Sequence, residues 1–328
     1  MREPQELPKL PLGLFPTPCC LLKSISARYG RRIFLKRDDL CGVAFGGNKV
    51  RKLQFLLADA KNKGCDTVFT TGAAQSNHAM LTAACAARLG MRCVLFLKAR
   101  GVMERRGNLL LDELFGAEVR FVDTDNYAVI YDAMVELDEE LSRQGHKSCA
   151  IPVGGSTPLG SLGYVECADE IARQCPSVEH IVCAAGSGGT AAGLLLGAKM
   201  YLPGVKVTGI AVDTDPFADI IPQLAADAAA LLDQPLSLEE GDLRIAPHIG
   251  PGYGQPNPAD TPYIEEMARL EGVLLDPVYT GKAWAGTLEL LRKGFFNGSS
   301  PIVFVHTGGA SALFAMDLPH EGAPAQEA

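Results

Sequence analysis

The segment "FGGNKVRKL", residues 45–53, places a lysine where its charge is unfavourable. The preceding "RRIFLKRDDL" is typical of a short strand, and "KVRKLQFLLADAKNKG" is typical of an amphipathic helix for which Asn48 is a natural N-cap. Lys49 therefore lies in the first helical turn, where the positive end of the helix dipole disfavours an ammonium group. The neutral amine is the nucleophilic form of lysine, so this position suits attack on a carbonyl group. For Arg51 and Lys52 we expect solvent exposure or pairing with the acids of "KRDDL".

A second segment, "CAAGSGGTAAGLLLG", has the composition of an anion site. Its glycines let backbone amides approach a ligand, its hydroxyls add donors, and the following helix directs its positive end to the same point. The candidate ligands of the anion are Gly186, Ser187, Gly188, Gly189 and Thr190. A phosphate here and a nucleophilic lysine nearby are what pyridoxal 5′-phosphate requires, because this aldehyde cofactor is held as a Schiff base. The sequence therefore predicts a pyridoxal-phosphate site around Lys49.

The same glycine segment also permits a different cofactor. Residues 186–191 satisfy the G-x-G-x-x-A pattern of dinucleotide-binding folds, and Asp213 ends the next predicted strand, where an acid that binds ribose is expected. A nicotinamide-dependent oxidoreductase is therefore the rival hypothesis. It uses one turn only and gives Lys49 no role.

Further polar or aromatic side chains follow predicted strands or lie in glycine-containing loops: Ser76, Asn77 and His78 in "TTGAAQSNHAM", Tyr253 in "GPGYGQP", Tyr279 in "DPVYTGKA" and Thr307 in "FVHTGGA". Either Ser76 or Asn77 is a natural N-cap for the helix that begins there. The same helix terminus, with its amide and hydroxyl side chains, also suits a substrate carboxylate. A lone tyrosine in a loop is usually only half-buried and has no special role. The two tyrosines are therefore candidate site residues only in combination with the other turns.

These turns need elements that bring them together. Apolar, β-rich runs alternate with glycine-rich turns and Ala/Leu-rich helices, for example in "DTVFTTGAAQSNHAMLTAACAARLG" and "HIVCAAGSGGTAAGLLLGAKMYLPG". Continuous apolar strands that alternate with helices predict βαβ units on a parallel sheet. Ligands of open parallel sheets bind beyond the carboxyl ends of the strands, which is where the quoted turns lie.

The bulk composition is that of an ordinary globular protein, with 47% hydrophobic and 21% charged residues in 328. A net charge of −8 without a basic stripe argues against nucleic-acid binding. No apolar run reaches the ~18 residues of a membrane span, and the N-terminus lacks the apolar core of a signal peptide. The ten cysteines include no C-x-x-C pair. We therefore expect a cytoplasmic protein with reduced cysteines, no metal site and no membrane partner.

Five segments taken together resemble a known family. "KRDDLCGVAFGGNKVRKLQFLLADA", "TTGAAQSNHA", "AAGSGGTAAGL", "LLDPVYTGKAWAG" and "VFVHTGGASALFA" are similar, in the same order, to the D-cysteine desulfhydrase and 1-aminocyclopropane-1-carboxylate deaminase family. The resemblance implies a pyridoxal-phosphate enzyme of the tryptophan-synthase β-subunit fold (fold type II), a two-domain, three-layer α/β/α structure with mostly parallel twisted sheets. It also implies a large domain of residues 1–52 and 157–328, an inserted domain of residues 53–156, an active site between them and a homodimer.

By motif, the resemblance implies how the cofactor is held. Lys49 forms the Schiff base, Asn77 binds the phenolic oxygen, and Thr307 faces the pyridine nitrogen. The glycine loop at residues 186–190 holds the phosphate.

The resemblance also implies catalytic roles for Lys49, Ser76 and Tyr279. Lys49, once the substrate has displaced it, moves protons at the substrate α-carbon, although the choice between Lys49 and Ser76 for this step stays open. The implied substrate pocket contains Ser76, Asn77, His78, Tyr253, Tyr279 and Thr280.

Two positions favour the desulfhydrase branch. The deaminase branch resembles a pattern with glutamate after the tyrosine that corresponds to Tyr279 and leucine in place of Thr307, whereas this chain has Thr280 and Thr307. A hydroxyl at the pyridine nitrogen makes a weaker electron sink than a carboxylate, which suffices when the leaving group is good. We therefore expect β-elimination on D-cysteine to give pyruvate, hydrogen sulfide and ammonia, with the deaminase or an L-cysteate sulfo-lyase as alternatives. Met80 and Leu81 stand where the family often has arginine and then a polar or methionine residue, which leaves the substrate and its stereochemistry open.

Overall fold

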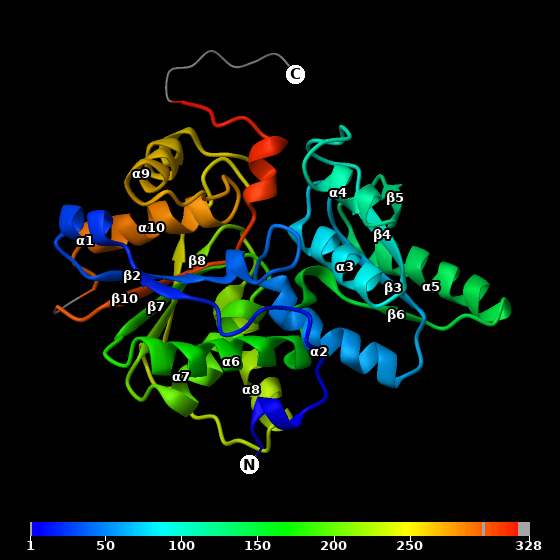
Figure 1. Cartoon of the computed structure of the whole chain (residues 1–328), viewed down its shortest axis with the longest axis horizontal. Helices are drawn as coiled ribbons and strands as arrows, with labels where there is room; N and C mark the ends of the chain where they lie inside the picture. The colour runs from blue at the N-terminus through cyan, green and yellow to red at the C-terminus, as the bar shows by residue number, and fades with distance from the viewer. Residues whose placement is uncertain (1, 297–298, 321–328) are drawn as a thin grey trace.

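The computed structural model describes residues 2–296 and 299–320, which form two α/β units side by side (Figure 1). The larger unit has a six-stranded sheet in the order β1-β2-β10-β7-β8-β9, in which only β1 is antiparallel. Its strands are β1 (Cys19–Leu21), β2 (Ile33–Arg37), β10 (Ile302–His306), β7 (His180–Ala185), β8 (Lys206–Ala211) and β9 (Leu243–Pro247). The smaller unit has a parallel four-stranded sheet in the order β5-β4-β3-β6. Its strands are β5 (Glu118–Val122), β4 (Arg92–Lys98), β3 (Thr67–Ala73) and β6 (Ser148–Ala150).

Helices cover both faces of each sheet, so each unit has three layers. On one face of the larger sheet pack α6 (Pro158–Gln174), α7 (Gly189–Tyr201) and α8 (Phe217–Leu231), and on the other α1 (Lys23–Tyr29), α9 (Thr261–Glu271) and α10 (Thr280–Arg292). On one face of the smaller sheet pack α2 (Lys49–Asn62), α3 (Asn77–Arg88) and α4 (Asn108–Leu114), and on the other α5 (Tyr127–Arg143). The predicted three-layer α/β fold with mostly parallel sheets is confirmed. None of the helices that the structure describes is long and apolar enough to cross a membrane.

The smaller sheet and the helices between its strands all lie within residues 53–156. Helix α2 carries the chain from one unit to the other, and the return connection precedes α6 (Figure 1). This arrangement supports the predicted division of the chain. We propose residues 1–52 and 157–328 as the large domain and residues 53–156 as the inserted domain.

Three neighbouring strands of the larger sheet bring distant parts of the sequence to one edge. Strand β10 is buried along its whole length between β2 and β7, as the continuous apolar run "IVFVH" requires. The turns that follow β2 and β10 touch each other, since Gly47 and Gly308 form an isolated bridge. A Cβ atom on Gly308 would lie 2.7 Å from the Cα of Gly47, so this approach requires glycine, which also accommodates the φ of +87° at Gly308.

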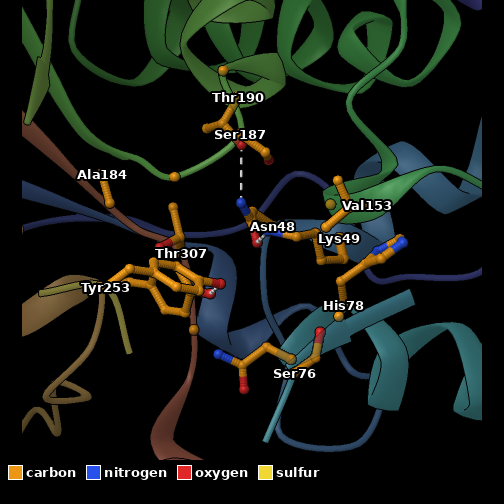
Figure 2. Close-up of a pocket in the computed structure, with 17 residues that line it drawn as sticks. Asn48, Lys49, Ser76, His78, Val153, Ala184, Ser187, Thr190, Tyr253 and Thr307 are labelled. Carbon is orange, nitrogen blue, oxygen red and sulfur yellow. Dashed lines mark hydrogen bonds between the residues drawn. The ribbon is translucent and has the colours of Figure 1, made fainter. Parts of the chain in front are cut away.

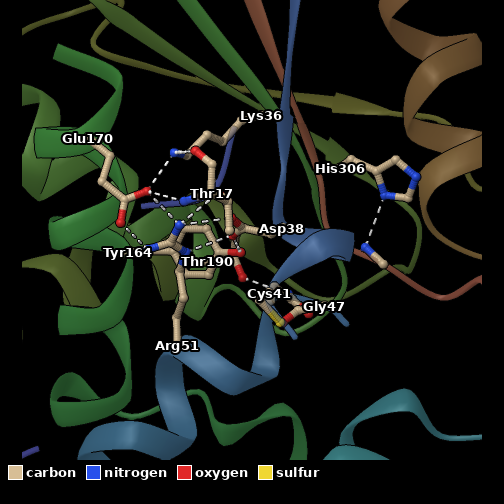
Figure 3. A network of polar contacts seen from close by, with 12 residues as sticks. Thr17, Lys36, Asp38, Cys41, Gly47, Arg51, Tyr164, Glu170, Thr190 and His306 are labelled. Atoms are coloured by element: carbon tan, nitrogen blue, oxygen red, sulfur yellow. Dashed lines mark hydrogen bonds and ion pairs between the residues drawn. The ribbon is translucent and has the colours of Figure 1, made fainter. Parts of the chain in front are cut away.

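A buried ion network fixes the start of α2 against α6 and the end of β2 (Figure 3). The guanidinium of Arg51 bonds both oxygens of Asp38, at 2.8 and 2.9 Å, and both oxygens of Glu170, at 2.8 Å each. Lys36 donates to Glu170 at 2.5 Å, and Tyr164 donates to Asp38 at 2.5 Å. Of the two roles expected for Arg51, solvent exposure is therefore wrong, and pairing with the acids of "KRDDL" is correct.

Candidate active site

One cavity lies at the carboxyl ends of β2, β10, β7 and β3, and most of the predicted site residues line it (Figure 2). The lining contains Lys49, residues 76–78, residues 186–188, Thr190, Tyr253, Tyr279 and Thr307. The remaining two predicted residues, Gly189 and Thr280, are not part of this lining. The structure thus gathers turns that are far apart in sequence.

Lys49 extends into the cavity from the first turn of α2. Its Nζ donates a hydrogen bond to Oδ1 of Asn48 at 3.0 Å. Burial lowers the pKa of the Lys49 amine to about 8, although the carboxylate of Asp276 acts in the opposite direction. A substantial fraction of the amine is therefore neutral near pH 8, which is the form that attacks an aldehyde.

Asn48 has a different role from the predicted N-cap. It adopts helical backbone angles, and its side chain makes no capping hydrogen bond. Instead Nδ2 donates to Oγ1 of Thr190 at 2.9 Å (Figure 2), so this side chain links the start of α2 to the glycine loop. The partner lies 142 residues further along the chain, which is why the local pattern misses it.

A second lysine lies behind the glycine-loop end of the cavity lining, next to Gly154 and Gly189, and the sequence pattern did not indicate it. Lys52 is buried, so the expectation that it is solvated or paired with an acid is wrong. Its Nζ donates to the carbonyl of Gly154 and to Oγ of Ser156, both at 3.0 Å. Ser156 Oγ also lies 2.8 Å from Oγ of Ser187 and accepts from the backbone amide of Gly189 at 3.2 Å.

These donors fit a phosphate. Burial, and then the neighbouring Lys49, hold the pKa of Lys52 well below its usual value, so an anion beside it would stabilise its charged form. A Cβ atom on Gly189 would lie only 2.9 Å from Nζ of Lys52, so a side chain there would crowd the donors. The amine, the hydroxyls and the amide at this end are the kinds of donor that bind a phosphate, and Lys49, which would hold the aldehyde of pyridoxal phosphate, lines the same cavity.

Gly188 has a conformational role of its own. Its φ is +83°, and a Cβ atom would lie 2.9 Å from Cγ2 of Ile220 on α8. A larger residue at position 188 would therefore strain the fold as well as disturb the loop, so a substitution at Lys52 tests phosphate binding more selectively.

We expect Lys52→Met to weaken binding of pyridoxal phosphate by roughly 10- to 100-fold, because a charge-assisted hydrogen bond to an anion is lost. The apoprotein should unfold at the same temperature or higher, since the substitution removes a buried amine whose two hydrogen-bond partners in the described chain are both neutral. Titration of the apoprotein with cofactor measures the affinity. The matched control is Lys61→Met, an exposed lysine of the same helix. Equal affinity in the two variants would contradict the assignment of Lys52.

Thr307 follows β10 and directs its side chain into the cavity (Figure 2). Its hydroxyl makes no hydrogen bond with any residue that the structure describes, so it is available to a ligand. The turn is held by His306, which lies 2.9 Å from the carbonyl of Leu274 and accepts from the amide of Gly308 at 3.1 Å. His306 is therefore a buried histidine that positions this turn.

The two predicted tyrosines form a pair, with their hydroxyl oxygens 2.5 Å apart. Asp276 fixes one of them, because its carboxylate accepts from the backbone amides of Val278, Tyr279 and Thr280. Thr280 is completely buried, and its hydroxyl donates to Asp276 at 2.6 Å instead of lining the cavity. A glutamate at position 280 would therefore face the carboxylate of Asp276. The segment "DPVYT" is typical of a turn in which an aspartate side chain accepts from the backbone amides that follow it. This signal was present in the sequence but was not used to assign Thr280.

The turn at the start of α3 both caps the helix and contributes to the cavity lining. Ser76 is the N-cap, since its Oγ accepts from the amide of Ala79 at 3.2 Å, and it also lines the cavity. Burial, followed by the cations of Lys49 and Lys52, holds the pKa of His78 well below its usual value, so its imidazole is neutral.

The two residues that depart from the family pattern are both about 1% exposed. Met80 and Leu81 pack in the apolar core of the smaller unit. They are not part of the cavity lining, so the departure changes packing behind the turn.

Comparison with known proteins agrees with this geometry. The family described as pyridoxal-phosphate dependent enzymes matches residues 10–308. A D-cysteine desulfhydrase of Klebsiella pneumoniae (strain 342) is 44% identical over 324 residues, which is 95% of this chain and 97% of the relative. The D-cysteine desulfhydrase of Salmonella newport (strain SL254) is 44% identical over 326 residues, with the same coverage.

Solved structures show the same relationship. A crystal structure of a protein described as an ACC deaminase homologue has a TM-score of 0.89 and 40% sequence identity, and the match covers 94% of each chain. The processed form of threonine deaminase isoform 2 from Solanum lycopersicum, 16% identical with a TM-score of 0.64 over 91% of this chain and 80% of its own, shares the fold. The glycine loop is therefore not that of a nicotinamide-dependent oxidoreductase. This chain belongs to the family of pyridoxal-phosphate dependent enzymes.

Proposed function

We propose that this enzyme eliminates hydrogen sulfide from D-cysteine and releases pyruvate and ammonia. The observation that carries the proposal is the hydroxyl of Thr307, which is free to meet a ligand in a cavity whose described lining contains no carboxylate. With no acid to hold a proton on the pyridine nitrogen, the cofactor is a modest electron sink. Such a sink suits a substrate with a good leaving group at its β-carbon.

The cofactor, when bound, supplies the electron sink that makes the α-C–H bond of the substrate acidic. Lys49 is our candidate for the base that takes the α-proton, because its amine is nucleophilic and basic near pH 8. The hydroxyl of Ser76 and the first amides of α3 bind the substrate carboxylate at the positive end of the helix. Asn77 and His78 complete this wall of the pocket.

Tyr279 is our candidate for the group that donates a hydrogen bond to the departing sulfur. Burial, followed by the neighbouring Tyr253, holds its pKa well above the usual value, so its hydroxyl keeps its proton. The hydroxyl of Tyr253, 2.5 Å away, orients it. Thr280 acts on this step indirectly, through the Asp276 turn that fixes Tyr279.

The relatives named D-cysteine desulfhydrase support D-cysteine as the substrate, since they match over nearly the whole chain. The ACC deaminase homologue supports a second candidate function, the opening of 1-aminocyclopropane-1-carboxylate to 2-oxobutanoate. That reaction has no good β-leaving group and should need a stronger sink than Thr307 provides. L-cysteate is a third substrate that fits the same chemistry.

We expect the holoenzyme to release sulfide and pyruvate in equal amounts from D-cysteine, and little or no 2-oxobutanoate from 1-aminocyclopropane-1-carboxylate. Parallel assays of pyruvate, sulfide, sulfite and 2-oxobutanoate with D-cysteine, L-cysteine, L-cysteate, D-serine and 1-aminocyclopropane-1-carboxylate measure the preference. Efficient release of 2-oxobutanoate would reverse the assignment in favour of the deaminase. Sulfite release from L-cysteate at a higher rate than sulfide release from D-cysteine would favour the sulfo-lyase.

The proposal extends to the setting of the enzyme. We place it in the cytoplasm as a homodimer that acts on a small amino acid, without nucleic-acid or membrane partners. The dimer rests on the family resemblance alone, and the ten free cysteines suit a reducing compartment.

A further inference from the structure

Three amide side chains form a connected group beside the cavity: Gln75, Asn77 and Asn108. Asn108 is the first residue of α4 and is completely buried. Asn77 borders the cavity, whereas Asn108 does not. The orientation of each amide follows from its partners, because a carbonyl oxygen only accepts and an NH₂ group only donates.

Gln75 is oriented by backbone groups alone. Its Oε1 accepts from the backbone amide of Asn108 at 2.8 Å, and its Nε2 donates to the carbonyls of Val102 and Arg106 at 3.1 Å each. Exchanging the oxygen and nitrogen of this side chain would place like groups against each other at all three contacts. Gly107, with φ of +55°, permits the close approach, since a Cβ atom there would lie 2.6 Å from Oε1 of Gln75.

Asn108 is oriented by Gln75 in turn. Its Nδ2 donates one hydrogen to the backbone carbonyl of Gln75 at 2.8 Å, which fixes the nitrogen on that side. The second hydrogen of the same nitrogen goes to Oδ1 of Asn77 at 2.9 Å. Both hydrogens of this amide are therefore used, and neither contact survives a flip.

Asn77 receives a second donor on the same oxygen. The hydroxyl of Ser311, from the segment after β10, donates to Oδ1 of Asn77 at 3.3 Å. Like Asn108, Ser311 lies outside the cavity lining. Within the part of the chain that the structure describes, Nδ2 of Asn77 makes no hydrogen bond, so the nitrogen is the end of the amide left for the cavity.

We propose that Asn108 is a positioning residue that holds the amide of Asn77 with its nitrogen toward the cofactor. The inference rests on the proposed function and on the contact of Asn77 with the phenolic oxygen of pyridoxal phosphate that the family resemblance implies. A nitrogen donor at that oxygen stabilises its negative charge, whereas the amide oxygen would repel it. Two donors on Oδ1, one from each proposed domain, select the productive orientation before the cofactor binds.

The test is the pH titration of the visible cofactor absorbance in the holoenzyme, with Asn108→Ala, Asn77→Ala and Asn126→Ala compared with the unmodified protein. Loss of a donor to the phenolic oxygen leaves its charge less stabilised, so the proton on the neighbouring imine nitrogen is held more tightly. We expect the titration midpoint to rise by about one pH unit in Asn108→Ala and in Asn77→Ala. Asn126, whose side chain only caps α5, is the control and should leave the midpoint unchanged.

An unchanged midpoint in Asn108→Ala would overturn the proposal. If Asn77→Ala shifts the midpoint in that case, the cofactor placement stands and only the role of Asn108 fails. If Asn77→Ala does not shift it either, the proposed contact of Asn77 with the cofactor fails as well.

A second variant covers the case in which Asn108→Ala does not fold. In Asn108→Ser the hydroxyl has one hydrogen and can serve either Gln75 or Asn77, but not both. We expect a smaller upward shift of the midpoint in this variant, and no shift would again overturn the proposal.

Discussion

Replacement of Lys49 by alanine should abolish turnover, by roughly 10³-fold or more, and remove the visible absorbance of the bound cofactor. The reason is that Lys49 extends a nucleophilic amine into the cavity, and no other lysine lines it in the described chain. The fold should be retained, because the amine makes one hydrogen bond, to Asn48, and its burial is unfavourable for the charged form. Initial rates with D-cysteine, absorption spectra and thermal unfolding of the purified variant measure the three effects.

The control for this substitution is Lys61→Ala, on the exposed part of the same helix. It should leave both the spectrum and the rate unchanged. Retention of full activity in Lys49→Ala would refute the proposed mechanism. Loss of activity together with a collapse of thermal stability would instead assign Lys49 to the fold.

Replacement of Arg51 by methionine should have the largest effect on stability, a loss of about 3–5 kcal/mol in the free energy of unfolding. The side chains of Arg51, Asp38 and Glu170 are 1%, 0% and 7% exposed. Methionine would leave two carboxylates buried with fewer compensating charges, which is the costly way to break a buried network. Denaturant unfolding followed by the fluorescence of Trp284, the only tryptophan and a buried one, measures the change.

Arg173→Met is the matched control, because Arg173 lies on α6 near Glu170 and pairs with Asp169 at the surface, with 65% of its side chain exposed. An exposed pair of this kind contributes about 0–1 kcal/mol. Similar losses in the two variants would show that burial of the Arg51 network adds nothing to stability. Because Arg51 lies in the same helical turn as Lys49, we also expect weaker cofactor binding in Arg51→Met.

The sequence was sufficient to predict the fold and most of the cavity lining for a local reason. Each of these side chains lies in a turn directly after an apolar strand, and the carboxyl ends of parallel strands meet at one edge of a sheet. Lys49, Ser76 and Thr307 could therefore be assigned from short segments alone. The assignment of roles to them still depends on the experiments above.

The misassigned residues are those whose partners are remote. Lys52 bonds Gly154, 102 residues away, and this contact cannot be read from the helical pattern of α2. For Arg51 the pairing with Asp38 was predicted, and only the contact with Glu170, 119 residues away, was missed. Asn48 was assigned as a cap because asparagine at that position is usually one, and its actual partner Thr190 is 142 residues away. Thr280 differs, since its partner Asp276 is four residues away and the turn was visible in the sequence.

The pairing of β2 with β10 has a consequence for how the protein folds during its synthesis. Residues 33–37 and 302–306 are neighbours in the sheet, although nearly the whole chain separates them. A chain still emerging from the ribosome lacks β10, a central strand of its larger sheet, so the cavity around Lys49 lacks Thr307 until residue 307 has been synthesised. Contacts of such long range also form slowly. The nascent chain therefore cannot assemble its cofactor pocket, and the newly released polypeptide must close its sheet before it can become a holoenzyme.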